Sequence, residues 1–366
     1  MVRVALLTYS TKPRGGVVHT LNLAEALAAL GVDVTVWSLA RQGDRGFFRV
    51  VDPRVGVRLV DFPDCGEESV TDRIVRSIAL LREAFNADDY DVVHAQDCIS
   101  TNAVGLCIRT IHHLDEFTTP VLAECHEKAV VEPYARICVS DAVAAEVRAG
   151  WGLSPTVIPN GVVAQRFTDA AADDGVAAVQ RGEWRRRLGR YVLAVGGIEP
   201  RKGTIDLVEA YHVLRQRFSD VKLVIAGGET LFDYRDYRAD FDGRCADLGV
   251  EPLILGAIED DELPSLVASC SVFAFPSTKE GFGLAAMEAL AAGRPVVTRD
   301  LPVLREVFGD TVSYGSTPTA FAQLMAEAVE SGVDPAPGRA LATSLTWEAA
   351  ARRHVEFYRA HPMPSA

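Results

Sequence analysis

The sequence has no long apolar run and no excess of positive charge. None of its hydrophobic stretches approaches the ~18 to 20 uncharged residues of a membrane-spanning helix. It carries 37 Lys and Arg against 50 Asp and Glu, a formal net charge of −13, which excludes the broad basic surface of a nucleic-acid-binding protein. Any phosphate site must therefore be local. The opening VRVALLTYS is too short for a signal peptide and leads into a Gly-rich turn, so we expect a cytoplasmic protein.

Motifs for disulfides and metal sites are also scarce. The seven cysteines are an odd number, and no two have the CxxC spacing of a redox pair or a zinc site. The histidines show no His-x3-His spacing. Two Asp-x-Asp triplets, 89–91 and 240–242, fit a metal-binding pattern, but neither follows a strand and we expect both at the surface. The sequence therefore predicts no disulfide and no metal cofactor.

Short apolar runs alternate with stretches of helical periodicity up to about residue 345, the pattern of βα units that build a parallel sheet. A chain of 366 residues exceeds the usual size of one hydrophobic core, so we expect two domains. In the first half the predicted strands are Val4–Leu7, Val34–Trp37, Val92–His94, Arg109–His112, Ile137–Val139 and Thr156–Ile158. In the second half they are Tyr191–Val195, Lys222–Ala226, Leu253–Leu255, Val272–Phe275 and Pro295–Thr298.

These runs predict an α/β protein with two Rossmann-like, doubly wound parallel-sheet domains, 1–165 and 166–345, facing an interdomain cleft. Residues 164–190 form a polar, charged segment with weak strand character between the two halves. A last helical stretch within 346–366 could return to the first domain. Open α/β sheets bind ligands beyond the carboxyl ends of their strands, so we expect the active site in the cleft.

The segment PSTKEGFGLAAMEALAAGRPVV (276–297) predicts a strand end, a loop with glycines and a helix that begins near Gly283. A helix start leaves backbone N–H groups unpaired, and these groups together with the helix dipole can hold a diphosphate. Glu280 and Glu288 bracket this start but are not side by side, so we expect them to bind sugar hydroxyls rather than to act as an acid/base pair. The predicted donor-binding residues here are Gly281, Phe282, Gly283, Leu284 and Glu288.

The segment AVGGIEPRKGTIDLVEAY (194–211) repeats the order of strand, turn and helix. Arg201 and Lys202 stand in the turn, where two cations can neutralise the charge that grows on a departing diphosphate. Cations at a helix start oppose the helix dipole, which argues against a purely structural role for the pair. Gly196 and Gly197 end the strand and are assigned to donor binding.

Two segments of the first half add weaker candidates. TYSTKPRGGVVHTLNLAEAL (8–27) places Gly15 and Gly16 after the first strand, but the segment is not GxGxxG and no clear ribose-binding acid follows. A pair of glycines by itself is often only a turn. RTIHHLDEF (109–117) ends a strand with two histidines, and the carboxyl end of a strand places His112 where it could hydrogen-bond a ligand.

With these motifs the chain resembles the retaining GT-B glycosyltransferases, especially glycosyltransferase family 4. Residues 280–288 look like the E-x7-E signature of that family, which implies that Glu280 contacts the donor sugar and Glu288 the ribose. His112 matches the active-site histidine of the family's T-x-H pattern. The likeness extends from about residue 3 to 310.

Two more matches concern the phosphates of the donor. Gly15 and Gly16 resemble the family's first loop, which approaches the donor phosphates and the acceptor. The family commonly has a basic residue directly after the first glycine of the second loop, where this chain has Gly197. We expect Arg201 to supply the missing cation.

The resemblance implies an enzyme that moves a sugar from a nucleoside-diphosphate sugar to an acceptor hydroxyl with retention of anomeric configuration. The implied catalytic residues are Arg201, Lys202, Glu280 and His112, with no metal ion. A local basic face of Arg73, Arg76 and Arg82 would allow peripheral contact with a lipid-linked acceptor. The alternatives are a GT-B-like phosphorylase, a nucleotide-sugar epimerase and a non-catalytic nucleotide-sugar-binding protein. A nicotinamide dehydrogenase is disfavoured because the dinucleotide fingerprint is missing.

Overall fold

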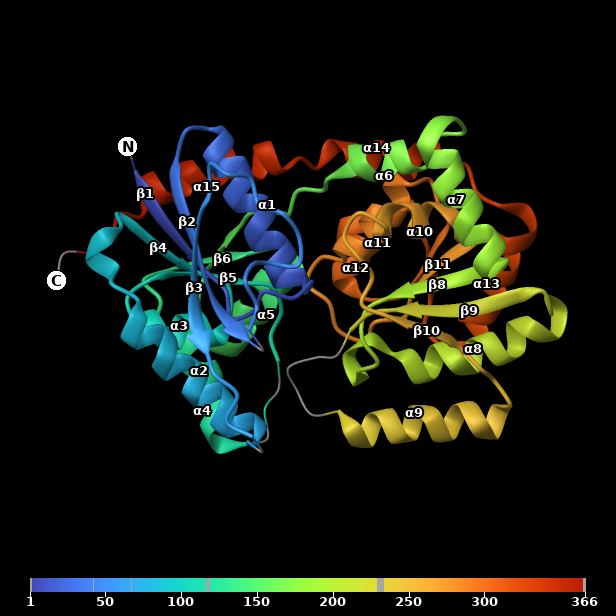
Figure 1. The fold of residues 1–366 in the computed structure, drawn as a ribbon, viewed down its shortest axis with the longest axis horizontal. Coiled ribbons are helices and arrows are strands. Elements are labelled where there is room, and N and C mark those ends of the chain that lie inside the picture. Colours follow the sequence, from blue (N-terminus) through green and yellow to red (C-terminus); the bar gives the residue numbers. More distant parts are fainter. Residues whose placement is uncertain are drawn as a thin grey trace. The chain divides into compact units, whose positions relative to one another are not determined.

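The computed structural model describes residues 2–41, 43–66, 68–115, 117, 119–228 and 234–364. The chain divides into two compact units, each with its own parallel sheet. Unit 1 comprises Met1–Gly161 and Thr346–Ala366, and unit 2 comprises Val162–Leu345. The doubly wound α/β fold predicted for each half is confirmed (Figure 1).

Among the described residues, the sheet of unit 1 has seven parallel strands in the order β3-β2-β1-β4-β5-β6-β7. The elements are β1 (Arg3–Leu7), α1 (Gly15–Ala29), β2 (Asp33–Arg41), β3 (Gly56–Phe62), α2 (Val70–Ala84), η1 (Ala87–Asp89), β4 (Val92–Ala95), α3 (Cys98–Val104), β5 (Ile108–Ile111), α4 (Pro120–Val131), β6 (Ala135–Cys138), α5 (Asp141–Trp151), β7 (Thr156–Val157) and α15 (Trp347–Ala360). The order reverses between β1 and β4, which is where open α/β sheets bind ligands.

Buried apolar side chains place the central strands of unit 1 in its interior. Residues 4–7 of β1 are fully buried, as expected for a parallel strand that helices cover on both faces. Figure 1 shows α1 and α15 on one face of this sheet and α2, α3 and α4 on the other. The helix α1 ends before Gly31, whose φ of 81° is a left-handed conformation that glycine adopts without strain.

The C-terminal helix α15 belongs to unit 1, although it follows unit 2 in the sequence. It packs against α1 (Figure 1). At Gly161 the chain passes so close to α15 that a Cβ atom would lie 2.2 Å from the backbone nitrogen of Trp347. A glycine is therefore required at 161, because no side chain fits between the two backbones.

Among the described residues, the sheet of unit 2 has six parallel strands in the order β10-β9-β8-β11-β12-β13. The elements are α6 (Ala164–Ala170), α7 (Gly175–Leu188), β8 (Arg190–Val195), η2 (Pro200–Lys202), α8 (Thr204–Arg217), β9 (Val221–Ala226), α9 (Arg235–Leu248), β10 (Leu253–Gly256), α10 (Leu263–Ser269), β11 (Val272–Phe275), α11 (Leu284–Ala291), β12 (Val296–Arg299), α12 (Pro302–Phe308), β13 (Ser313–Gly315), α13 (Pro318–Ser331) and α14 (Ala336–Ser344). Here β8 and β11 are neighbours at the reversal of strand order.

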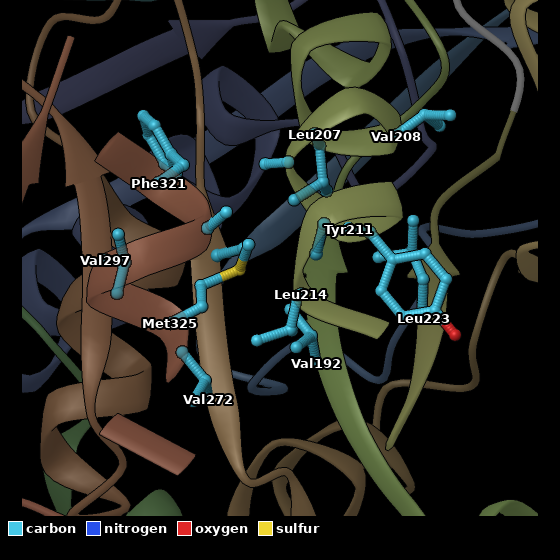
Figure 2. Close-up of a cluster of buried hydrophobic side chains, with 14 of the residues drawn as sticks. Val192, Leu207, Val208, Tyr211, Leu214, Leu223, Val272, Val297, Phe321 and Met325 are labelled. Carbon is cyan, nitrogen blue, oxygen red and sulfur yellow. The ribbon is translucent and has the colours of Figure 1, made fainter. Parts of the chain in front are cut away.

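One face of the unit 2 sheet is covered by α8 and α13, which pack against each other. Figure 2 shows Leu207 and Leu214 of α8 pointing toward Phe321 and Met325 of α13, within a buried cluster that also takes side chains from the strands. Each of these large side chains contributes about 1.5 to 3 kcal/mol by leaving water. This core fixes the strands whose ends carry the candidate site.

The structure differs from the sequence prediction in three places. Strand β3 was missed although its residues alternate between apolar and polar types, a pattern typical of a half-buried strand. The edge strand β13 has three residues and was missed for its shortness. Residues 164–190, predicted as a polar segment with weak strand character, contain the helices α6 and α7 instead. Trp184 of α7 anchors that helix through a 3.0 Å hydrogen bond from Nε1 to Ser265 Oγ.

Candidate functional site

The loops after β8 and β11 bring three charged side chains of unit 2 together. Lys202 Nζ donates a 2.6 Å hydrogen bond to Glu280 Oε1, and Arg201 Nη1 donates one of 3.1 Å to the same oxygen. Arg201 Nη2 also lies 3.1 Å from Glu199 Oε1. β8 and β11 are adjacent parallel strands, so their carboxyl ends meet at one edge and place these loops side by side. The sequence named Arg201, Lys202 and Glu280 but did not predict that they pair with each other.

This charged group is sheltered from water. The side chains of Glu280 and Glu199 are each 11% exposed, and that of Lys202 is 18% exposed. The loops are also joined through the backbone, since Thr278 N donates a 2.8 Å hydrogen bond to Arg201 O. Partial burial lowers the effective dielectric constant, so these cations would act strongly on an anion beside them.

Two glycines allow the chain to fold closely at the end of β8, beside Lys202. The alkyl carbons of Lys202 lie 3.2 to 3.5 Å from where a Cβ of Gly196 would stand. A Cβ on Gly227, which follows β9, would lie 2.2 Å from the backbone of Gly196 and 2.7 Å from Gly197 N. Gly227 was not named from the sequence, although the pair Gly227-Gly228 after a predicted strand is a signal of the same kind as Gly196-Gly197.

A third glycine and an arginine connect the loops after β8 and β11. Gly203 has a φ of 61°, and a Cβ there would lie 2.3 Å from Pro276 O. Arg299, at the end of β12, donates a 2.9 Å hydrogen bond from Nε to the same carbonyl and pairs with Asp206 in the first turn of α8. No sequence motif marks Arg299, because its role depends on the neighbouring position of β11 and β12.

The helix α11 begins where the sequence places it, within one residue. Gly283 is its N-cap in the left-handed conformation (φ 96°), and a Cβ there would press on the Phe308 ring at 3.0 Å. Gly281 and Phe282 are buried, and Leu284 is the first helical residue. No side chain of the described residues caps this helix. Its first N–H groups are therefore available to an anion.

Glu288 lies in the second turn of α11, apart from Glu280. Part of its surface is exposed, but dense surroundings bury its carboxyl group and raise its pKa to about 8. Arg166 opposes this shift and Asp260 adds to it, and these two residues form an ion pair of 2.9 Å. Within the described part of the chain no hydrogen bond reaches the carboxyl group of Glu288, so its carboxyl oxygens are available to ligand hydroxyls. The carboxyl groups of the two glutamates thus have different surroundings, and it stays a prediction that they do not act as an acid/base pair.

In unit 1, His112 follows β5 at the carboxyl edge of the sheet. Gly16 lies against it, since a Cβ on Gly16 would be 3.7 Å from the imidazole, whereas a Cβ on Gly15 would meet nothing within 4 Å in the described structure. Burial, with smaller contributions from His19 and Arg109, lowers the pKa of His112 well below its usual value. His112 is therefore neutral at pH 7, and within the described residues its buried Nε2 has no hydrogen-bond partner.

His112 ends a row of buried histidines that the sequence did not reveal. Its ring centroid lies 4.6 Å from that of His19, whose Nδ1 is 2.8 Å from Asn160 Oδ1. His354 of α15 lies between His19 and His94, with ring centroids 6.3 and 5.8 Å away. The sequence could not show this row because its members come from α1, β4 and α15. Its physical effect is to tie the C-terminal helix to the elements beside His112.

The remaining sequence predictions concern metals, cysteines and membranes. Asp89, Asp91, Asp240 and Asp242 are all exposed, as expected. In the described ranges, no group of three or more His, Cys, Asp or Glu side chains is placed to hold a metal ion. All seven cysteines are free thiols. None of the described helices combines the length and the apolar character needed to cross a membrane.

Comparison with known proteins agrees with this arrangement. Residues 181–337 match the model of the glycosyl transferases group 1, and residues 13–166 match glycosyltransferase family 4. A phosphatidyl-myo-inositol mannosyltransferase of Mycolicibacterium smegmatis is 30% identical over 328 residues, covering 82% of this chain and 77% of that protein. A D-inositol 3-phosphate glycosyltransferase of Salinispora arenicola is 30% identical over 362 residues, covering 85% and 79% of the two chains.

Solved structures show the same fold at lower identity. A sucrose-phosphate synthase of Thermosynechococcus elongatus superposes with a TM-score of 0.79 at 19% identity, covering 98% of this chain and 99% of the other. Anabaena HepE, solved in complex with UDP and glucose, gives a TM-score of 0.74 at 18% identity, covering 99% of this chain and 100% of HepE.

The two Rossmann-like units, with a basic loop and a glycine-led helix at the strand ends of the second, define a glycosyltransferase of the GT-B class. Within that class the chain belongs to the glycosyl transferases group 1, with a family 4 N-terminal part. It is a transferase, which sets aside the epimerase and binding-protein alternatives. The phosphorylase alternative is also a glycosyl transfer and is tested below.

Proposed function

We propose that this enzyme transfers a sugar from a nucleoside-diphosphate sugar to an acceptor hydroxyl with retention of anomeric configuration and without a metal ion. The observation that carries the proposal is the contact of Lys202 and Arg201 with Glu280 at the carboxyl ends of β8 and β11. A sugar diphosphate needs both kinds of group, cations for its phosphates and a carboxylate for its hydroxyls. UDP-glucose is bound to HepE, a protein of the same fold.

Each group has a proposed role that follows from its chemistry. Lys202, Arg201 and the first N–H groups of α11 stabilise the negative charge on the leaving diphosphate. Glu280 accepts hydrogen bonds from sugar hydroxyls, and Glu288 accepts them from the ribose. His112, which is neutral, hydrogen-bonds the sugar through Nε2. The glycines beside these groups let the donor come close to the backbone.

In the proposed reaction the bond between the anomeric carbon and the diphosphate oxygen breaks, and the acceptor oxygen bonds to the same face of the sugar. The proton of the acceptor hydroxyl passes to the departing diphosphate oxygen. No protein side chain forms a covalent bond with the sugar. The cations are therefore the main catalytic groups, because the leaving diphosphate is where charge develops.

The related proteins do not identify the acceptor of this enzyme. One is named for phosphatidyl-myo-inositol and another for D-inositol 3-phosphate, so members of this family act on different acceptors. We propose a hydroxyl compound as acceptor here, and a cytoplasmic location remains our expectation.

A thermal-shift screen of nucleoside diphosphates and their sugars tests the donor. A true donor at ~100 times its dissociation constant should add ~2.7 kcal/mol to the stability of the folded state. The donor so found is then incubated with candidate acceptors, and proton NMR of the product gives its anomeric configuration. Release of nucleoside diphosphate with a retained anomer supports the proposal. An inverted anomer, or turnover that requires inorganic phosphate, contradicts it.

A further inference from the structure

Three arginines of unit 2 lie at the amino edge of its sheet, opposite the edge that carries the candidate site. Arg185 is in the last turn of α7, which leads into β8, and Arg294 lies two residues before β12. Arg339 lies near the start of α14, which packs on α11, and α7 packs on α10 (Figure 1). These three residues are called the unit 2 arginine group below.

The end of α11 brings Arg339 close to Arg294. Gly293 ends that helix in the left-handed conformation, with a φ of 70°, and Arg294 follows it directly. A Cβ on Gly293 would lie 2.6 to 2.9 Å from Nη2, Nε and Cζ of Arg339, and a Cβ on Gly338 would lie 2.8 Å from Leu290 Cδ2. The two glycines therefore let α14 approach the end of α11, so that the Arg339 guanidinium lies over it.

No carboxylate balances the unit 2 arginine group. In the part of the chain that the structure describes, none of its three members has a carboxylate oxygen within 4.0 Å. Arg294 Nε donates a 3.3 Å hydrogen bond to Ala292 O, a neutral carbonyl. Arg339 Nε is buried and has no hydrogen-bond partner among the described residues. A buried donor without a partner costs free energy, so this place favours an added acceptor.

The surroundings of Arg294 add positive charge rather than negative charge. Burial lowers the pKa of its guanidinium, and the other two members of the group lower it further, together with Arg181. Arg181 is itself balanced, since its Nη2 pairs with Asp173 at 3.0 Å. The nearby thiol of Cys270 is no counter-ion, because burial raises its pKa to about 12 and it is neutral at pH 7.

Two helix ends offset part of this charge. The helices α7 and α11 both end at the group, and each carboxyl end of a helix is equivalent to about half a negative charge. Three cations against two such ends leave about two positive charges. A phosphate monoester carries about −1.5 to −2 charges at pH 7, and its oxygens match the planar fork of donors that arginine presents. The charge of the group therefore fits one phosphate dianion.

The basic face expected from the sequence in unit 1 is different. Arg76 holds Glu68 there through two hydrogen bonds of 2.7 and 2.8 Å. Arg82 Nη2 donates a hydrogen bond to Asn102 O on α3. Two of the three arginines of that face thus have partners within unit 1, whereas the unit 2 arginine group has no carboxylate among the described residues.

We propose that Arg185, Arg294 and Arg339 bind the phosphate group of a small soluble compound at a site separate from the donor site. The helix α11 begins after Gly283 at the candidate donor site, and its other end lies at the arginine group. Its eight residues span about 12 Å, so a phosphate held here is not the reacting diphosphate. Arg294 is half-buried and Arg339 Nε is buried, which suits a small compound better than a flat membrane surface.

The test observes the arginines directly. The protein is labelled with 15N-arginine, and the Nε–H signals of Arg294 and Arg339 are identified as those missing from R294Q and R339Q. Inorganic phosphate and glycerol 3-phosphate are added in turn at constant ionic strength, with sodium chloride as the control. We expect both signals to shift and to saturate with at least one phosphate probe but not with chloride. The shifts should persist in K202A, whose candidate donor site lacks its lysine.

Variants of the group measure what each arginine contributes. R294Q, followed through the Arg339 signal, should bind the phosphate probe about tenfold or more weakly than the wild type. R294K keeps the charge but not the fork of donors, so it should bind with intermediate strength. R185Q removes an exposed member and should also weaken binding. R186Q is the matched control on α7, because Arg186 is exposed and lies 3.9 Å from Glu183, and it should bind like the wild type.

Several results would overturn the site. These are no shift with either phosphate probe, an equal shift with chloride, and equal binding by R294Q and wild type at equal unfolding temperatures. If R294Q does not fold, equal binding by R185Q and wild type has the same meaning. A shift only with vesicles of phosphatidylcholine and phosphatidylglycerol would place the group at a membrane surface and overturn the small-compound site. Because no turnover is measured, failure of the proposed reaction would leave these results unchanged.

Discussion

Lys202 Nζ lies 2.6 Å from Glu280 Oε1, and the two residues stand 78 positions apart in the chain. Arg201 Nη1 reaches the same oxygen at 3.1 Å, so one carboxylate oxygen receives two cations. A donor diphosphate would compete with Glu280 for these cations. In the proposed reaction the ion pairs with Arg201 and Lys202 position Glu280. Its carboxylate then lies beside the donor phosphates and contacts the sugar.

Replacing Glu280 by glutamine should separate nucleotide binding from catalysis. E280Q removes the negative charge between Arg201 and Lys202. The affinity of the variant for nucleoside diphosphates should therefore be at least that of the wild type, and up to several-fold higher. Turnover should fall by about 10²-fold or more, because the sugar loses a charged hydrogen-bond acceptor. Titration calorimetry and initial rates measure the two effects, with E327Q on the exposed surface of α13 as a control. Loss of nucleotide binding in E280Q would show that Glu280 holds the nucleotide instead.

Glu288 should make stability depend on pH in a defined range. The pKa of its carboxyl group is about 8 in the folded protein against an ordinary 4.5. Between these values the folded state keeps a proton that the unfolded chain has lost, so stability falls as pH rises, by at most about 1.4 kcal/mol per pH unit. E288Q cannot titrate, and its unfolding temperature relative to the wild type should rise from pH 5 to pH 8 and level off above. Parallel curves for E288Q and wild type would refute this, and E251Q serves as an exposed control.

Gly203 should tolerate no side chain. An alanine there would place Cβ 2.3 Å from Pro276 O at a φ of 61°, and the loop that carries Arg201 and Lys202 would have to move. Gly152 is a matched control, because it is also left-handed (φ 66°, ψ 12°) but a Cβ there meets nothing within 4 Å in the described structure.

We expect G152A to cost about 1 kcal/mol of stability and to keep its activity. G203A should cost more, about 3 kcal/mol, and should lose most of its turnover. Chemical denaturation and initial rates compare the two variants. Equal losses in both would mean that the contact with Pro276 does not position the loop.

The sequence predicted most of this fold because its central strands are continuous apolar runs. It also named Arg201, Lys202 and Glu280 of the charged group, because glycines and charges follow those runs, but it did not name Glu199. What it could not predict depends on which strands are neighbours. Arg299 contacts Pro276 only because β12 lies beside β11.

Edge strands and contacts between residues far apart in the chain could not be predicted from the sequence for related reasons. Strand β3 is an edge strand whose alternation of apolar and polar residues is a weaker signal than the continuous apolar runs of the central strands. The row of His19, His94 and His354 joins three elements, one of which returns after the whole of unit 2.

The turnover of K202A at saturating donor tests the account most directly. If Lys202 stabilises the charge on the leaving diphosphate, kcat should fall by about 10²-fold or more while the unfolding temperature stays near that of the wild type. K222A, which changes an exposed lysine on β9 of the same unit, should keep the wild-type rate. A folded K202A enzyme with unchanged kcat would contradict the central role given to this cation.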